Sequence, residues 1–151
     1  MLLDRARRLL PGLWAGLLLT VALVATPAPF ALLTQADAGR VVSRVLAQEA
    51  YASLALGVLL LVLERLLARR QALTGRGTQF SLGMVLCLGA LFCTVAGYFA
   101  LQPLMAQARQ GHGVLGFGQL HAISAAFYLV KCGLVLVLAW RAAAPPASSQ
   151  A

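Results

Sequence analysis

The sequence LHAISAAFYLVKCGLVLVLAW, residues 120–140, is 21 residues long and has one charged residue, Lys131. As a helix it would be about 30 Å long, which matches the hydrocarbon core of a bilayer. Three further apolar runs cover residues 9–33, 45–63 and 80–101. We therefore expect one domain, an all-α integral membrane four-helix bundle, with helices at about 9–33, 45–67, 80–101 and 119–140.

The composition excludes a soluble protein. Of the 151 residues, 61% are hydrophobic and only 11% are charged, whereas soluble domains carry about a quarter charged residues. The formal net charge is +8 at pH 7, but the arginines flank the apolar runs and form no dense patch. We therefore expect the lipid bilayer as the main partner and no nucleic acid.

The arginines also indicate the orientation. One side of the four runs carries most of them, namely Arg5, Arg7, Arg8, Arg65, Arg69, Arg70, Arg76 and Arg141. The other side has Arg40, Arg44 and Arg109. Because cytoplasmic loops are enriched in arginine and lysine, both termini are expected in the cytoplasm. The predicted location is a bacterial-type inner membrane.

The ends of the runs contain helix-breaking and capping signals. Pro27 and Pro29 should kink or stop the first helix at 25–30, because proline lacks the backbone donor. The first run is longer than a signal-peptide core of about 7–15 residues, so we expect it to remain in the protein. Residues 142–151, rich in alanine, proline and serine, are expected to form a disordered tail.

The first outer loop is expected to contain a short interfacial helix. Asp37 is a suitable N-cap for a helix starting at Ala38. The apolar residues Val41, Val42, Val45 and Leu46 then recur at helical spacing. Small residues are expected to bring helices close together, with Gly12, Gly16 and Thr20 on the first helix and Ser53 and Gly57 on the second.

No pattern indicates an enzyme, a metal site or a cofactor. The three cysteines lie inside apolar runs and are read as small core residues, not disulfides. His112 stands between two glycines in a loop, and His121 is on a helix, so the pair is not arranged for haem or a transition metal. No nucleotide-binding loop or catalytic triad is present. Catalytic and metal-ligating residues are therefore expected to be absent.

Polar residues cluster at the outer ends of the predicted helices. We expect one buried cluster of Glu49, Gln102, Arg109, His121 and Ser124. A carboxylate inside the membrane is costly unless it is paired, and Arg44, Arg109 and His121 are the expected partners of Glu49. The cluster fits two roles: a clamp that holds the outer helix ends together, or a binding or proton-relay site in an outward-facing vestibule.

Lys131 lies deeper in the fourth helix. His121, Ser124, Tyr128, Lys131 and Cys132 fall on one face, since a helix advances about 100° per residue. Tyr98 lies on a similar face of the third helix, together with Thr94 and Gly97, and the two faces are expected to meet. Tyr98, Tyr128 and Lys131 are candidates for lining a path. Lys131 has two other readings: snorkelling towards the cytoplasm and donating to inner polar groups.

Several strings, in order along the chain, resemble the bacterial family catalogued as domain of unknown function 4149. They are residues 12–16, 27–30, 38–41, 48–51, 102–105 and 117–124. The sequence is also similar to the eukaryotic transmembrane protein 205-like group. The resemblance implies a four-helix membrane protein whose polar motif residues are Glu49, Gln102, Pro103, His121 and Ser124. Lys131 is outside that pattern.

Two functional classes follow from these observations. The first is a non-enzymatic structural or interaction subunit of a membrane complex. The second is permeation of a small solute, metal or proton by a homo-oligomer, which the drug- and metal-complex tolerance linked to the eukaryotic group favours. A continuous polar path through Lys131 would favour permeation. A polar cluster sealed on the cytoplasmic side by leucines would favour the subunit.

Overall fold

The computed structural model describes residues 2–73 and 81–144. Its helices are α1 (Leu2–Thr20), α2 (Pro27–Leu32), α3 (Gln35–Leu73), α4 (Leu82–Thr94), α5 (Leu101–Arg109) and α6 (Phe117–Ala143). Two π-helical turns, η1 (Val21–Ala25) and η2 (Val95–Ala100), join α1 to α2 and α4 to α5. These residues form four helices long and apolar enough to cross a membrane and contain no strand, which confirms the predicted all-α class.

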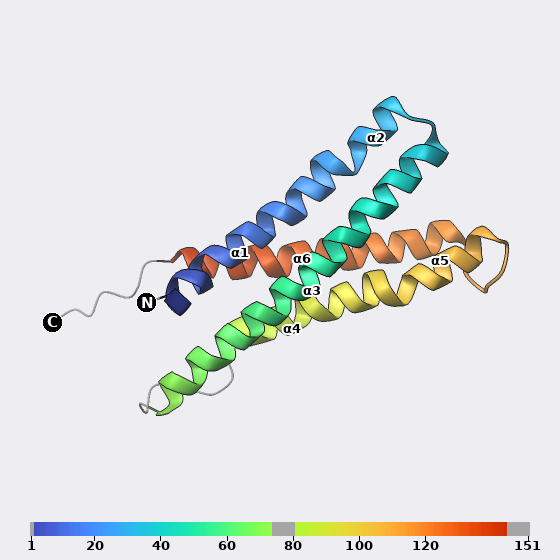
Figure 1. Ribbon diagram of the computed structural model, residues 1–151. Helices are drawn as coiled ribbons and strands as arrows, with labels where there is room; N and C mark the ends of the chain where they lie inside the picture. The colour runs from blue at the N-terminus through green and yellow to red at the C-terminus, as the bar shows by residue number, and fades with distance from the viewer. Residues whose placement is uncertain (1, 74–80, 145–151) are drawn as a thin grey trace.

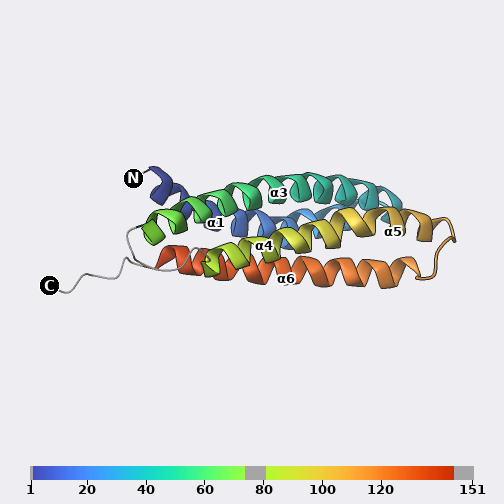
Figure 2. The same cartoon turned by 90° about the horizontal axis from the view of Figure 1, so that it is seen from below.

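The helices form two hairpins that pack together over one half of their length. α1 packs against α3 and α6, and α4 packs against α3 and α6. Figure 1 shows that the hairpin of α2 and α3 diverges from that of α5 and α6 at the end away from the chain termini. We call the four membrane-spanning units rods; they are α1–η1–α2, α3, α4–η2–α5 and α6. Seen from below, all four rods run in nearly the same direction (Figure 2). The start of α1 and the end of α6 lie at the same end of the bundle, which we call the terminal end; the opposite end is the loop end.

The apolar core fills the terminal half of the bundle. Its centre consists of side chains that are 0–1% exposed, namely Trp14, Leu18, Leu60, Cys87, Ala90 and Val135. The outward faces are also apolar: Leu13 is 67% exposed, Phe92 63% and Leu23 71%. A soluble protein would not expose so many large apolar side chains together. The exposed faces are therefore suited to lipid.

The first membrane-spanning rod changes its hydrogen bonding just before its prolines, as the sequence predicts. The backbone N–H of Thr26 donates to the carbonyl of Val21 at 2.9 Å, five residues back. Pro27 then occupies the first position of α2, where a missing N–H is tolerated. The second hairpin repeats this order, with η2 followed by Pro103 in α5.

The first outer loop is helical, as the sequence predicts, but it is the start of a longer helix and not a short helix of its own. α3 begins at Gln35 and continues without a break to Leu73. Thr34, not Asp37, caps it: the Asp37 N–H donates to Thr34 Oγ1 at 3.3 Å. No proline interrupts residues 35–73, so the outer segment and the membrane span propagate as one helix.

Other boundaries also differ from the expected ones. α6 includes Ala142 and Ala143, which were expected in the tail, while residues 145–151 lie outside the described residues. Ser53 and Gly57 do face another helix, since a Cβ on Gly57 would come within 3.2 Å of the Trp14 ring. Gly12 and Gly16 instead point away from the bundle, and a Cβ on either would meet nothing within 4 Å.

Candidate functional site

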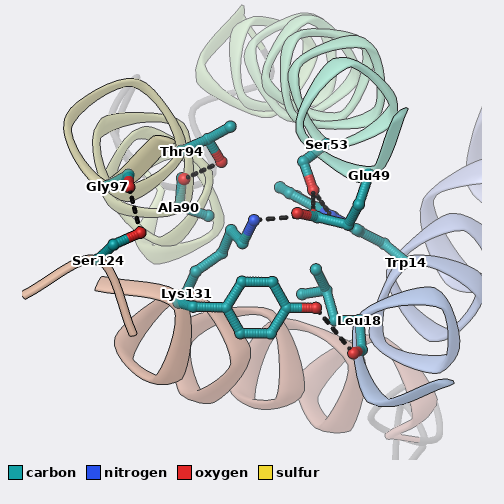
Figure 3. A network of polar contacts seen from close by, with 10 residues as sticks. Trp14, Leu18, Glu49, Ser53, Ala90, Thr94, Gly97, Ser124 and Lys131 are labelled. Carbon is teal, nitrogen blue, oxygen red and sulfur yellow. Dashed lines mark hydrogen bonds and ion pairs between the residues drawn. The ribbon is translucent and has the colours of Figure 1, made fainter. Parts of the chain in front are cut away.

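A buried ion pair joins α3 to α6 at the centre of the bundle. Lys131 Nζ lies 2.7 Å from Glu49 Oε1, and the two residues are 3% and 4% exposed. Ser53, one turn further along α3, donates its hydroxyl to the same carboxylate oxygen. Figure 3 shows Lys131 and Glu49 pointing at one another from facing helices. Opposite charges at this separation stabilise each other where water does not compete.

Neighbouring groups hold both partners in place. The Trp14 indole N–H from α1 donates to Ser53 Oγ at 2.9 Å, which links a third helix to the carboxylate. Tyr128, one turn before Lys131 on α6, donates its hydroxyl to the Leu18 carbonyl at 2.9 Å. Its ring lies 4.6 Å from Lys131 Nζ, within the range of a cation–π contact. The pair is therefore fixed by α1, α3 and α6 together.

The pair forms the floor of a cavity of about 1100 Å³ that reaches the loop end of the bundle. Its walls come from η1, α2 and the first half of α3 on one side, and from α4, η2, α5 and the first half of α6 on the other. The structure brings every sequence-predicted site residue to this cavity; they are Glu49, Tyr98, Gln102, Arg109, His121, Ser124, Tyr128 and Lys131. The cavity follows from the divergence of the two hairpins in Figure 1.

Glu49 does not have the partners that the sequence suggested. Within the described residues it bonds to Ser53 and Lys131, and not to Arg44, Arg109 or His121. The expected helix began at about residue 45, which placed Glu49 near its outer end. In the structure α3 begins at Gln35, so Glu49 lies 14 residues into α3, just as Lys131 lies 14 residues into α6, and the two side chains meet. The long lysine side chain covers the remaining distance.

The other predicted residues occupy the walls and the mouth. Ser124 donates its hydroxyl to the Gly97 carbonyl at 2.6 Å, so the polar faces of α6 and η2 meet as predicted. At the mouth, the Arg109 guanidinium lies 4.6 Å from the centre of the Phe117 ring, and His121 stacks on that ring at 5.9 Å. His112 is exposed in the turn between Gly111 and Gly113, both of which have positive φ.

The cavity is closed on the terminal side. Immediately beyond the ion pair, Trp14, Leu60, Cys87, Ala90 and Val135 pack together with exposures of 0–1%. Each of the four rods contributes at least one of these side chains. No polar side chain belongs to this cluster. Among the described residues, the hydrogen-bonded polar groups run from Lys131 through Glu49 and Ser53 to the Trp14 indole, where the apolar cluster begins.

A second buried carboxylate, Glu64, was missed by the sequence reasoning. It is 3% exposed and lies 3.2 Å, Oε2 to Nη2, from Arg7 of α1. Ser81, the N-cap of α4, donates to Glu64 Oε2 at 3.0 Å. Gly83 makes room for it, since a Cβ there would come within 2.3 Å of Oε2. Because Arg65 stands next to it, Glu64 resembles an ordinary loop charge in the sequence. The signal that could have identified Glu64 is its position fifteen residues after Glu49, on nearly the same helical face.

Arg7→Leu is expected to lower the free energy of unfolding by about 1–3 kcal/mol, because Glu64 would lose a charge-assisted hydrogen bond while staying buried. Arg8→Leu is the matched control, because Arg8 is on the same helix and exposed; its effect should stay within about 0.5 kcal/mol. Denaturant unfolding in detergent, followed by circular dichroism, measures both. Equal effects of the two substitutions would contradict the clamp.

Metal-binding geometry is absent from the described part of the chain. Residues 2–73 and 81–144 contain no group of three or more histidine, cysteine or acidic side chains close enough to hold an ion. Cys87, Cys93 and Cys132 are free and buried. Their burial agrees with the reading of these cysteines as core residues.

These features define a multi-pass membrane protein with four apolar helices, lipid-suited outer faces and, at one end, a cavity with polar groups at its floor and mouth. The chain belongs to the family described as Domain of unknown function (DUF4149), which matches residues 9–113. Glu49, Gln102 and Arg109 lie inside the matched region, and His121, Ser124 and Lys131 lie beyond it. No curated protein and no solved structure matches the chain. The likeness to the transmembrane protein 205-like group has no support from these comparisons.

Proposed function

We propose that the chain is a non-enzymatic binding subunit of a bacterial inner membrane, which holds a molecule in its cavity from the outer side. The observation that carries this proposal is the cavity of about 1100 Å³ with the Glu49–Lys131 pair as its floor. Largely preformed concave sites with a few converging polar groups are typical of ligand binding. Ionisable residues inside a membrane bundle commonly mark such sites.

The closed floor favours a binding or interaction subunit over permeation. A permeating solute would have to pass Trp14, Leu60 and Val135, which are packed without exposed surface. Gly12 and Gly16 on the outside of α1 leave a face that a second copy or a partner helix could approach closely. This face supports the part of the proposal that concerns an oligomer or a membrane complex.

We also propose that the loop end faces the outside of the cell, because most of the arginines lie at the terminal end. In right-side-out vesicles, Gln110→Cys at the loop end is expected to react with a membrane-impermeant maleimide. Ala143→Cys at the terminal end is expected to react only after the vesicles are opened. Both are made in a background with Cys87, Cys93 and Cys132 replaced by alanine. Reaction of Ala143→Cys alone in sealed vesicles would reverse the orientation.

The same background tests whether the cavity is open on one side only. Gln102→Cys lines the cavity and should react with the impermeant reagent from the loop side. Val135 lies beyond the floor and its side chain is 0% exposed. Val135→Cys should therefore react from neither side. Protection of Gln102→Cys would overturn the binding proposal. Reaction of Val135→Cys would instead support the permeation alternative.

A further inference from the structure

We propose that the cavity binds the carboxylate of an amphipathic organic monoanion on Lys131, in exchange for Glu49, which takes up one proton. This inference rests on the proposed function, because the ligand must reach the floor through the open cavity. It adds a ligand class and a coupled proton to that function.

The walls of the cavity indicate an amphipathic ligand. Apolar side chains from both hairpins line it, among them Phe30, Leu46, Met105 and Leu129. Polar groups are concentrated at the floor and at the mouth. A ligand with one charged end and an apolar body would place each part against a matching surface.

The charges that line the cavity favour an anion. The charged lining residues are Arg40, Arg109, Lys131 and Glu49, counting histidine as neutral. Arg40 forms an ion pair with Asp37, and Lys131 forms one with Glu49. Arg109 has its guanidinium over the Phe117 ring, with no ion pair among the described residues. The excess positive charge at the mouth would concentrate anions there.

The floor has the geometry of an exchange site. A lysine ammonium has three donors, and Lys131 uses one of them on Glu49 Oε1. Both hydrogen bonds received by Glu49 within the described residues fall on that same oxygen. The carboxylate therefore occupies the place that a ligand carboxylate would take, and Ser53 would still hold Glu49 after the exchange.

Charge balance at the floor requires the proton. Two carboxylates beside one buried ammonium would repel each other and leave one negative charge unpaired. If Glu49 takes a proton from solvent as the ligand carboxylate arrives, the floor still holds one carboxylate and one ammonium. The titratable groups that surround the pair are Cys93 on α4, Tyr98 on η2, and Tyr128 and Cys132 on α6. Phenols and thiols are ordinarily protonated at neutral pH, and His121 lies away from the pair at the mouth, so at the floor Glu49 is the group that can accept the proton.

Calorimetric titration with octanoate tests the inference, using the full chain in lipid nanodiscs. Titrations in imidazole and in bis-Tris buffers, which differ in ionisation enthalpy, give the number of protons taken up per octanoate. We expect one proton, and a fall in affinity of about tenfold per pH unit wherever that proton is taken up on binding. Glu49→Gln should bind octanoate without proton uptake and without this pH dependence. The double variant Glu49→Gln with Lys131→Met should lose octanoate binding.

Two further arms separate the possible failures. Ala125→Trp fills the cavity wall, while Ala126→Trp is its matched control, since Ala126 is exposed and does not line the cavity. If Ala125→Trp abolishes octanoate binding but the unsubstituted chain takes up no proton on binding, the exchange is overturned and the binding function stands. Binding of octylamine in place of octanoate would overturn the anion class. Octanoate binding unaffected by Ala125→Trp would place the ligand outside the cavity and overturn this inference; the cysteine labelling decides the proposed function independently. Palmitate supplied in the nanodisc lipid, compared with aqueous octanoate, shows whether the anion comes from the membrane or from solution.

Discussion

Lys131→Met is expected to lower the free energy of unfolding by about 3–5 kcal/mol. Among the described residues, the substitution leaves Glu49, which is 4% exposed, with the Ser53 hydroxyl as its one remaining partner. An unpaired carboxylate in the interior of a membrane protein is strongly unfavourable. Denaturant unfolding in detergent, followed by circular dichroism, measures the effect.

Removing both charges should recover most of this stability. The double variant Glu49→Gln with Lys131→Met has no buried charge, and replacement of a buried pair by neutral groups is often close to neutral. A double-mutant cycle should therefore show strong coupling between the two positions. If the two substitutions add independently, the ion pair does not stabilise the fold in the way proposed.

Trp14→Ala is expected to cost about 3–5 kcal/mol, because the side chain is 0% exposed and its removal leaves a cavity among four helices. The substitution also removes the indole N–H that holds Ser53. Trp14→Phe keeps most of the ring and removes that donor, so it should cost less. The same unfolding measurement by circular dichroism applies to both variants.

Trp140 provides the control for this prediction. It has the same side chain, but it is 84% exposed on the outer face of α6. Trp140→Ala should change the free energy of unfolding by only about 0.5 kcal/mol, as is usual for substitutions outside the core. Equal losses at Trp14 and Trp140 would contradict the position of the core.

The sequence identified the residues around the cavity better than it identified their contacts. Glu49, Gln102, His121 and Ser124 were grouped because they are polar residues near helix ends, and the structure places all of them on one cavity. The sequence did not reveal Glu64 as a buried residue, because it lies next to Arg65 at the end of an apolar run, where charged residues are common. In the structure its burial under Ser81 and Gly83 distinguishes it from an ordinary loop charge.

The amino-acid sequence by itself determined the membrane class, the four spanning segments and the interruption of the first helix before Pro27. These properties depend on local quantities: the transfer free energy of about 20 consecutive side chains and the missing donor of proline. Tertiary structure alone decided that Glu49 meets Lys131 across the bundle. It also decided that the cavity is closed by Trp14, Leu60 and Val135. Partners across a bundle depend on the crossing angles and rotations of whole helices, which follow from the packing of all their faces together.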